Sequence, residues 1–397
     1  MDEPARGRES SWVRDFVLVA ISRFGIFFSH RQTQPVFPVY LSSLGASGVL
    51  IGLIMSSFTV TATVVRPFVG LWIDRSGRKG FLLLGTALLA GAALGYAWAP
   101  SLALLVVFRM VQGLGWSAAT TTVNTLAADI APAERRGAML AYAGLASNLG
   151  AALGPIAGFA AYERFGFHGM FLTVFGVIVM SLFFSLPLAE PQRPPAGEER
   201  SRSWLQLLFV RESFLPSIVM TFVAFGHAGV TTYIPLYVLE EKMGNPALYF
   251  AVEAVFVIVS RPIGGPLSDR FSRRTVILPG FALYLVGLVL IALAPSIWFL
   301  LAAAAFNGMG VGLVHAPLMA LAIDRVPAGR RGLSMAQFQT FHELGNMCGT
   351  FTLGALLDLT ARNFSRMFFV AAAVVASGFV LYIAAGKEPM RRRSQAG

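Results

Sequence analysis

Apolar segments of about 20 residues or more recur along the whole chain, and this feature constrains its fold most strongly. Of the 397 residues, 56% are hydrophobic and 13% are charged. Backbone polar groups inside a bilayer must be satisfied within the spanning structure, so such segments predict transmembrane helices. We expect an all-α integral membrane protein with twelve spans, at roughly 15–41, 47–73, 80–98, 101–128, 137–162, 167–187, 213–239, 246–268, 275–294, 297–324, 333–358 and 364–386.

One connection between these segments differs from the others. Most are short, but residues 188–212 are rich in proline and charge, which is typical of a solvated linker. We therefore expect a polar N-terminus (1–14), a six-helix bundle over 15–187, a second over 213–386 and a basic tail over 387–397. The first apolar segment is too long for the apolar core of a signal peptide, so we expect it to be retained.

Lysine and arginine are concentrated on one side of the predicted membrane. Of 31 such residues, 22 lie at the termini, in the linker and in the loops after even-numbered spans, whereas four lie on the other side. Basic loops stay in the cytoplasm, so we expect both termini and the linker on the cytoplasmic side of the membrane. Loops that face anionic lipid explain the net charge of +11, and we expect no nucleic-acid partner.

A charged loop occurs at matching points of the two halves. Residues 70–80 read GLWIDRSGRKG, and residues 265–275, which lie 195 positions further on, read GPLSDRFSRRT. With the same offset, DIAPAERRG (129–137) matches DRVPAGRRG (324–332). A parallel repeat of two six-span halves is typical of transporters that expose one site to each side of the membrane in turn.

The first of these loops resembles the signature loop between helices 2 and 3 of the major facilitator superfamily. The second-half copy is partial, since Phe271 and Ser272 replace Ser76 and Gly77. The matching positions are Gly70, Asp74, Arg75, Gly77, Arg78 and Lys79 in the first loop, with Asp269 and Arg270 in the copy.

Two further stretches resemble motifs of this family, and the resemblance covers essentially the whole chain. Residues 108–119 are similar to the Arg-x-x-Gln-Gly pattern of helix 4, and residues 149–159 to the helix 5 motif of the drug/proton antiporter branch. The resemblance implies twelve helices in two pseudo-symmetric six-helix bundles and secondary active transport. The matching residues are Arg109, Gln112 and Gly113 in helix 4, and Gly150, Gly154, Pro155 and Gly158 in helix 5.

The signature loop has two interpretations. Asp74 can cap the start of the next helix, and Arg78 can reach Asp129 at the end of helix 4, as the family's charge cluster implies. Such a cluster would form when the cytoplasmic side is closed and break when it opens. Alternatively, these charges only follow the positive-inside rule.

The helix 5 motif also has two interpretations. Gly150, Gly154 and Gly158 share one face and allow close approach of a neighbouring backbone, and Pro155 permits a bend. A smooth, slightly bent helix favours sliding or rocking during transport. Ordinary packing of small residues explains the same pattern.

Ionisable residues inside the spans are candidates for the transport chemistry, because a charge in hydrocarbon needs a partner or a wet cavity. Glu343 lies about 15 Å inside its span and shares a face with Gln339 and Asn346, with His342 alongside. A carboxyl group there can carry a proton or contact substrate, or it pairs permanently with a cation.

The other candidates have equally open roles. Glu253 is either a proton site or a partner in an ion pair at the outer gate. His30 and His227 lie in the outer halves of spans 1 and 7, where they form either a gate pair or ordinary packing contacts. The first span has no acidic residue at its middle, where several drug antiporters of this family carry one, and this leaves room for anionic or zwitterionic cargo. The remaining basic candidates are Arg23, Arg31, Arg109 and His315.

The sequence therefore predicts a proton-coupled exporter of a small organic molecule that works by alternating access. Proton-coupled uptake on the same fold is the alternative. We expect no enzyme activity, no metal and no cofactor. His342 and Glu343 resemble the start of a zinc-protease motif, but Asn346 stands where that motif needs a second histidine. The sequence also has no phosphate-binding glycine loop. The proton gradient supplies the energy, and we expect a monomer.

Overall fold

The computed structural model describes the backbone of residues 3–130, 136–190, 210–327 and 330–385. It describes their side chains from Trp12 onward, except for residues 71, 74–76, 136–138, 141 and 269. The regular structure in these ranges is helical and contains no strand, which confirms the all-α class. Nine of the helices in these ranges are long and apolar enough to cross a membrane.

The helices follow the predicted spans closely, and most ends agree within a few residues. In chain order they are α1 (Glu3–Thr33), α2 (Phe37–Ser43), α3 (Gly48–Ser76), α4 (Arg78–Trp98), α5 (Leu102–Ile130), α6 (Arg136–Ser185), the 3-10 turn η2 (Arg211–Ser213), α8 (Phe214–Glu240), α9 (Pro246–Arg270), α10 (Arg273–Ala292), α11 (Ile297–Asp324), α12 (Arg331–Leu359) and α13 (Phe364–Ala385).

Three spans differ from the prediction. The first, 15–41, is interrupted between α1 and α2, near Pro35 and Pro38, and α1 begins already at Glu3. The fifth and sixth join in α6, which is broken only at Gly166. This glycine has φ +67, a conformation that it adopts without the steric cost of a side chain. The count of twelve spans stays a prediction.

Local sequence signals explain several helix starts. Ser47 and Ser272 accept hydrogen bonds from backbone amides of the first turns of α3 and α10. Asn245 caps α9 in the same way, and Pro246 follows it at a position where a helix needs no amide donor.

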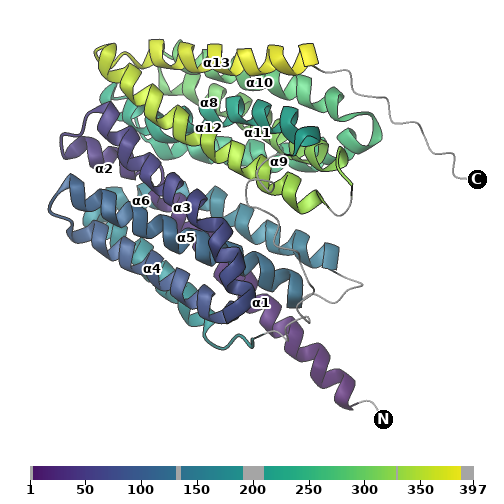
Figure 1. Cartoon of the computed structure of the whole chain (residues 1–397). Helices are drawn as coiled ribbons and strands as arrows, with labels where there is room; N and C mark the ends of the chain where they lie inside the picture. Colours follow the sequence, from purple (N-terminus) through teal and green to yellow (C-terminus); the bar gives the residue numbers. More distant parts are fainter. Residues whose placement is uncertain (1–2, 131–135, 191–209, 328–329, 386–397) are drawn as a thin grey trace, which may run out of the picture. The chain divides into compact units, whose positions relative to one another are not determined.

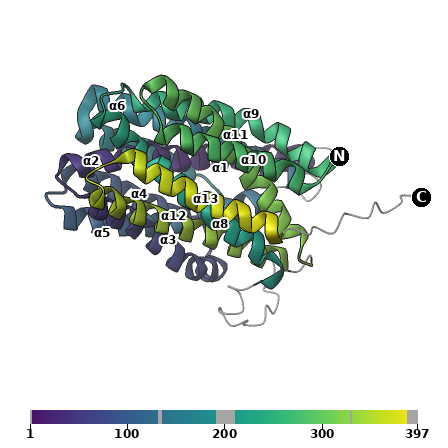
Figure 2. The ribbon, with the colours of Figure 1, turned by 90° about the horizontal axis from the view of Figure 1, so that it is seen from above.

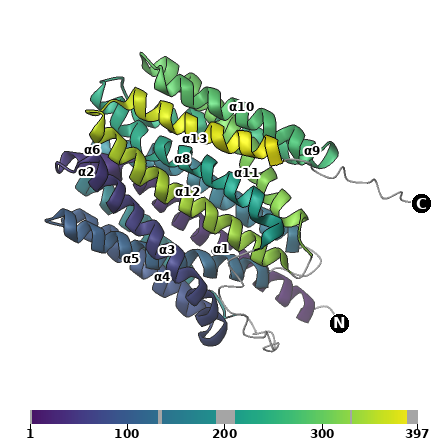
Figure 3. The same cartoon turned by 45° about the horizontal axis from the view of Figure 1, so that its top comes forward.

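The chain divides into two compact units, residues 1–199 with 231–239 and residues 200–230 with 240–397. In the first unit α1 packs along α6, and α5 packs against both α3 and α4 (Figure 1). In the second unit α11 packs against both α9 and α10 (Figure 2), and α10 lies beside α13 (Figure 3). The neighbours of α5 and of α11 thus correspond. The exact domain boundaries stay a prediction.

A pair of glycines shows this correspondence at atomic scale. A Cβ added to Gly113 of α5 would lie 2.6 Å from the carbonyl oxygen of Phe58 in α3, so only glycine fits there. Gly308 of α11 makes the same close contact with the carbonyl of Glu253 in α9. Both pairs differ by 195 positions (113 and 308, 58 and 253), so the repeat extends to helix packing.

Candidate functional site

Arg78 of the signature loop forms an ion pair with Asp129 at the end of α5. Its Nε lies 2.7 Å from Oδ2 of Asp129, and the two side chains are only 11% and 25% exposed. The contact that the sequence suggested is therefore present, and it joins the start of α4 to the end of α5. The side chains of Asp74 and Arg75 lie outside the described residues, so the role of this loop as a gate stays a prediction.

Glu190, which the sequence pattern did not single out, binds the start of α4. Its carboxylate accepts hydrogen bonds from the backbone amides of Arg78 (2.6 Å) and Lys79 (2.8 Å). A helix start leaves its first amides without intrahelical acceptors and favours negative charge. The Asp74 side chain lies outside the described part of the chain, so the capping role expected of Asp74 stays a prediction. Glu190 accepts from both amides, and its separation from them by 111–112 residues explains why no local motif revealed it.

The second unit contains the same ion pair. Nη2 of Arg273 lies 3.0 Å from Oδ2 of Asp324 at the end of α11, and Nη1 donates to Ser268 at 2.6 Å. Arg273 and Asp324 match Arg78 and Asp129 with the offset of 195 (78 and 273, 129 and 324). In the partial loop copy, the Arg270 guanidinium lies 5.6 Å from the Phe271 ring centroid, and the Asp269 side chain lies outside the described part.

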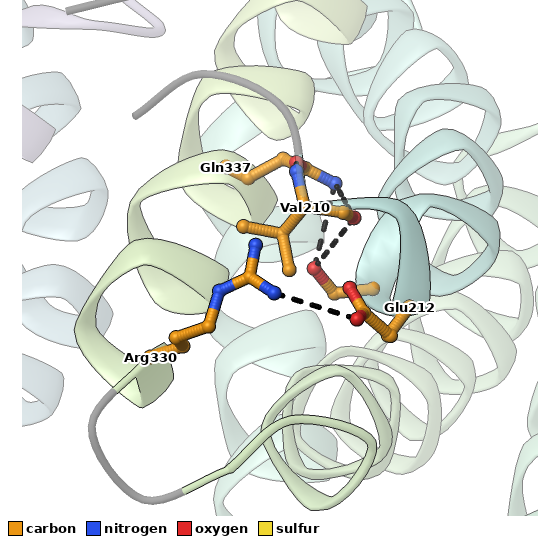
Figure 4. Close-up of polar contacts among 5 residues, drawn as sticks. Val210, Glu212, Arg330 and Gln337 are labelled. Atoms are coloured by element: carbon orange, nitrogen blue, oxygen red, sulfur yellow. Dashed lines mark hydrogen bonds and ion pairs between the residues drawn. The ribbon is translucent and has the colours of Figure 1, made fainter. Parts of the chain in front are cut away.

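Further contacts at this end of the second unit hold the start of α8 (Figure 4). The side-chain oxygen of Gln337 in α12 accepts a hydrogen bond from the backbone N–H of Val210. The side-chain nitrogen of Gln337 donates to the backbone carbonyl of Val210 at 3.2 Å. Arg330 pairs with Glu212 at 3.4 Å. The chain that enters the second bundle is thus bound to the start of α12.

The glycine face of α6 packs directly on the backbone of α1. A Cβ on Gly150 would lie 2.6 Å from the Phe24 carbonyl oxygen, and one on Gly154 would lie 2.7 Å from that of Phe28. Gly158 makes an equally close contact with the carbonyl of Gln32. The predicted close approach is therefore real, and α1 is the neighbour. Its role in transport, with the bend expected at Pro155, stays a prediction.

A second glycine face occurs in α12 and escaped the sequence comparison. A Cβ on Gly345 would lie 2.8 Å from Cβ of Ala224, and one on Gly349 would lie 2.8 Å from Cα of Phe225, both in α8. These glycines match Gly150 and Gly154 with the offset of 195 (150 and 345, 154 and 349), which was the signal that could have found them.

Arg109 is enclosed in the first unit, where it is 1% exposed. It donates to the Gln112 side chain at 2.8 Å, and Tyr96 donates to the same oxygen at 2.8 Å. Its guanidinium also lies 4.4 Å from the Phe37 ring centroid and 5.5 Å from that of Phe58. Arg109 is thus a buried cation held by neutral partners.

The predicted residues of α1 have different surroundings, and His30 shares its neighbour Phe58 with Arg109. The His30 ring stacks against the rings of both Trp116 (4.1 Å) and Phe58 (4.9 Å). Arg31 donates to Gln34 at 2.8 Å, and Arg23 donates to Ser147 of α6. The predicted pairing of His30 with His227 joins the two units and stays a prediction.

Glu253 is buried in α9, with 6% of its surface exposed. Tyr249 lies one turn before it on the same helix, and Asn307 of α11 donates to the Tyr249 hydroxyl at 2.7 Å. Asn307 matches Gln112 with the offset of 195 (112 and 307). The second unit therefore has a polar cluster built around an acid where the first has one built around Arg109.

The polar face of α12 extends to α11. The rings of His342 and His315 meet edge to face with centroids 5.6 Å apart, and the Asn346 amide lies 3.3 Å from Nδ1 of His342. Glu343 and Gln339 are partly buried on the same helix. The expected grouping of His342 with Asn346 is present, and His315 adds a residue from a neighbouring helix. Among the described side chains, no three His, Cys, Asp or Glu residues gather as metal ligands would.

Comparison with known proteins agrees with this geometry. The family profile described as Major Facilitator Superfamily matches residues 18–259 and 246–397. The quinolone resistance protein NorA of Staphylococcus aureus is 24% identical over 371 residues, which cover 91% of this chain and 93% of NorA. Multidrug resistance protein 1 of Bacillus subtilis is 25% identical over 362 residues, which cover 88% and 90% of the two chains.

Solved transporter structures share the fold. A POT family transporter in complex with 5-aminolevulinic acid aligns with a TM-score of 0.78 at 15% identity, over 94% of this chain and 96% of that one. The nucleoside transporter NupG aligns with a TM-score of 0.75 at 13% identity, over 93% and 99% of the two chains. The chain is a multi-pass membrane protein and belongs to the major facilitator superfamily.

Proposed function

We propose that this protein exports a small organic molecule across the bacterial cytoplasmic membrane by alternating access, in exchange for protons. The duplicated ion pair, Arg78–Asp129 and Arg273–Asp324, is the observation that carries the proposal. The names of the relatives, a quinolone resistance protein and a multidrug resistance protein, support the outward direction. Both termini and the linker face the cytoplasm, in line with the basic loops.

The ion pairs suit a closed state that must open in every cycle. Each joins the start of one helix to the end of another at the same end of its unit, and each is partly exposed to solvent. Pairs of this kind contribute about 0.2–1 kcal/mol each, which is little enough to be lost without unfolding a unit. The same pair in both units stabilises the equivalent junction of two helices in each bundle.

Glu343 is the proposed proton carrier. It is partly buried in α12, and the adjacent residue on this helix, His342, contacts both Asn346 and His315. Protonation would neutralise the carboxylate and so lower the free-energy cost of placing this side chain in hydrocarbon. No cofactor is needed in this scheme, because the proton gradient supplies the energy, and one polypeptide is the working unit.

Uptake of an organic anion together with protons is the second candidate. No acidic residue lies between Asp15 and Asp74, a stretch that covers all of the first two predicted spans except Asp15 itself, and this favours uptake of an anion. Flux measured in vesicles of known orientation with an imposed proton gradient separates the two. Export predicts substrate and proton movement in opposite directions, and uptake predicts movement in the same direction.

A further inference from the structure

The predicted spans of the first unit carry an excess of positive charge. Arg23, Arg31 and Arg109 lie inside them, whereas the acidic residues lie at their ends or in loops. A cation at membrane depth persists only with a partner or a wet cavity. Between residues 15 and 190 the acidic residues are Asp15, Asp74, Asp129, Glu134, Glu163 and Glu190.

Arg23 is less enclosed than Arg109. It is partly buried in α1, about 12 Å into the predicted span, and Ser147 of α6 lies at a similar depth, about 15 Å into its own. By contrast, Arg109 is 1% exposed and enclosed by aromatic rings.

The contacts of Arg23 hold its orientation without neutralising it. Its Nε donates to the Ser147 hydroxyl, which in turn donates to the Ala143 carbonyl at 3.2 Å, so Ser147 accepts from the arginine. The guanidinium carbon lies 5.6 Å from the Phe27 ring centroid. Within the described part of the chain, neither terminal nitrogen of Arg23 has a hydrogen-bond acceptor.

These features fit one kind of ligand group. Two terminal guanidinium nitrogens form a planar pair of donors that matches the two oxygens of a carboxylate. Phe27, beside the guanidinium, also packs edge to face with Trp116, with ring centroids 5.0 Å apart, so an aromatic surface adjoins the donors. Aromatic rings of a ligand pack well on such a surface.

We propose that Arg23, oriented by Ser147, binds a carboxylate of the cargo while Phe27 contacts an attached aromatic ring. The substrates are then aromatic carboxylates or zwitterions that carry one. This inference rests on the proposed function as a transporter and names the class of molecule that it moves.

Binding to the purified full-length protein tests the inference without any transport step. The probes are 2-naphthoate, its uncharged amide 2-naphthamide and the cation 2-naphthylmethylamine, and the readout is ligand-induced thermal stabilisation across a concentration series. We expect 2-naphthoate to bind at least about ten-fold more tightly than the amide, as a charge-assisted bidentate contact implies. Arg23→Gln should remove this preference, and Arg23→Lys should keep part of it.

Two further variants make the test specific. Ser147→Ala should weaken 2-naphthoate binding less than Arg23→Gln does, because it removes only the orienting contact. Arg164→Gln, at an exposed position of α6, removes the same charge and should change nothing. Melting curves without ligand show whether each variant is folded. If Arg23→Gln does not fold, Arg23→Lys replaces it in the binding comparison.

The inference is overturned if the wild type shows no preference for 2-naphthoate over 2-naphthamide, if it prefers the amine, or if Arg23→Gln keeps the carboxylate preference. Its failure is distinct from failure of the proposed function. A protein that binds 2-naphthoate through Arg23 but moves no substrate in vesicles would contradict transport alone.

Discussion

At the residue scale, the account depends on a few charged side chains at helix ends. Arg78 and Asp129 could be paired from the sequence because both belong to patterns that recur in the second half. Glu190 could not, since its partners are backbone amides 111–112 residues away and any acidic residue brought there by the fold would serve. Sequence patterns find side chains that repeat, and they miss side chains that bind backbone.

Asp129→Asn should impair transport while the protein still folds. The change removes the charge that pairs with Arg78 but keeps the shape of the side chain. We expect the apparent melting temperature to fall by less than about 4 °C, because such pairs contribute about 0.2–1 kcal/mol. Glu163→Gln, an exposed acid between the two halves of α6, is the matched control. Normal flux in a well-folded Asp129→Asn protein would remove the ion pair from the mechanism, and Asp74→Asn tests the same loop.

Glu190→Ala should loosen the start of α4. Loss of the carboxylate leaves the amides of Arg78 and Lys79 without their acceptor, at a cost of about 0.5–2 kcal/mol by analogy with other helix caps. Hydrogen exchange should accelerate in the first turn of α4 and stay unchanged in the first turn of α10, which Ser272 caps. Equal exchange in both turns of the variant and the wild type would mean that Glu190 contributes nothing there.

At the element scale, helix positions were well predicted and helix rotations were not. The ends of α11, Ile297–Asp324, coincide with the predicted span because apolar composition changes sharply there. The surroundings of Glu253 and His315 depend on how helices turn about their axes, and apolar residues on every side of a membrane helix conceal that rotation. The clusters around these residues therefore needed the structure.

Gly154→Leu should separate α1 from α6 and slow transport. The new side chain would start 2.7 Å from the Phe28 carbonyl oxygen, so the helices must move apart, and overpacking of this kind typically costs about 1–3 kcal/mol. The control is Gly144→Leu on the same helix, where an added Cβ meets nothing within 4 Å. Gly349→Leu should repeat the effect in the second unit. Equal transport by the Gly154 and Gly144 variants would refute the packing argument.

At the scale of the whole molecule, the repeat explains most of what could be predicted. The offset of 195 positions relates loops, ion pairs and glycine contacts between the units. Apart from Arg66 and Arg261, it does not relate the ionisable residues inside the spans, and Phe58, for example, stands where Glu253 does in the second half. Chemistry specific to one unit breaks the repeat, and for that reason the repeat cannot reveal it.

Glu343→Gln separates proton coupling from substrate exchange. The substitution mimics a permanently protonated carboxyl group, so exchange of substrate across the membrane should persist while accumulation driven by a pH gradient is lost. If Glu343 instead serves as a permanent ion-pair partner, the variant should lose stability by about 3–5 kcal/mol. Thermal stability and flux are measured on one preparation, with Glu253→Gln alongside. A stable variant that still accumulates substrate would show that Glu343 is not the proton carrier.

The central claim is outward transport in exchange for protons, and proton movement in inside-out vesicles with an acidic interior tests it most directly. A pH-sensitive dye trapped inside reports proton exit after a quinolone or 2-naphthoate is added outside. The account predicts that the interior becomes more alkaline on addition, and that Asp129→Asn abolishes this change. No change, or one that appears only when the compound is loaded inside the vesicles, would contradict it.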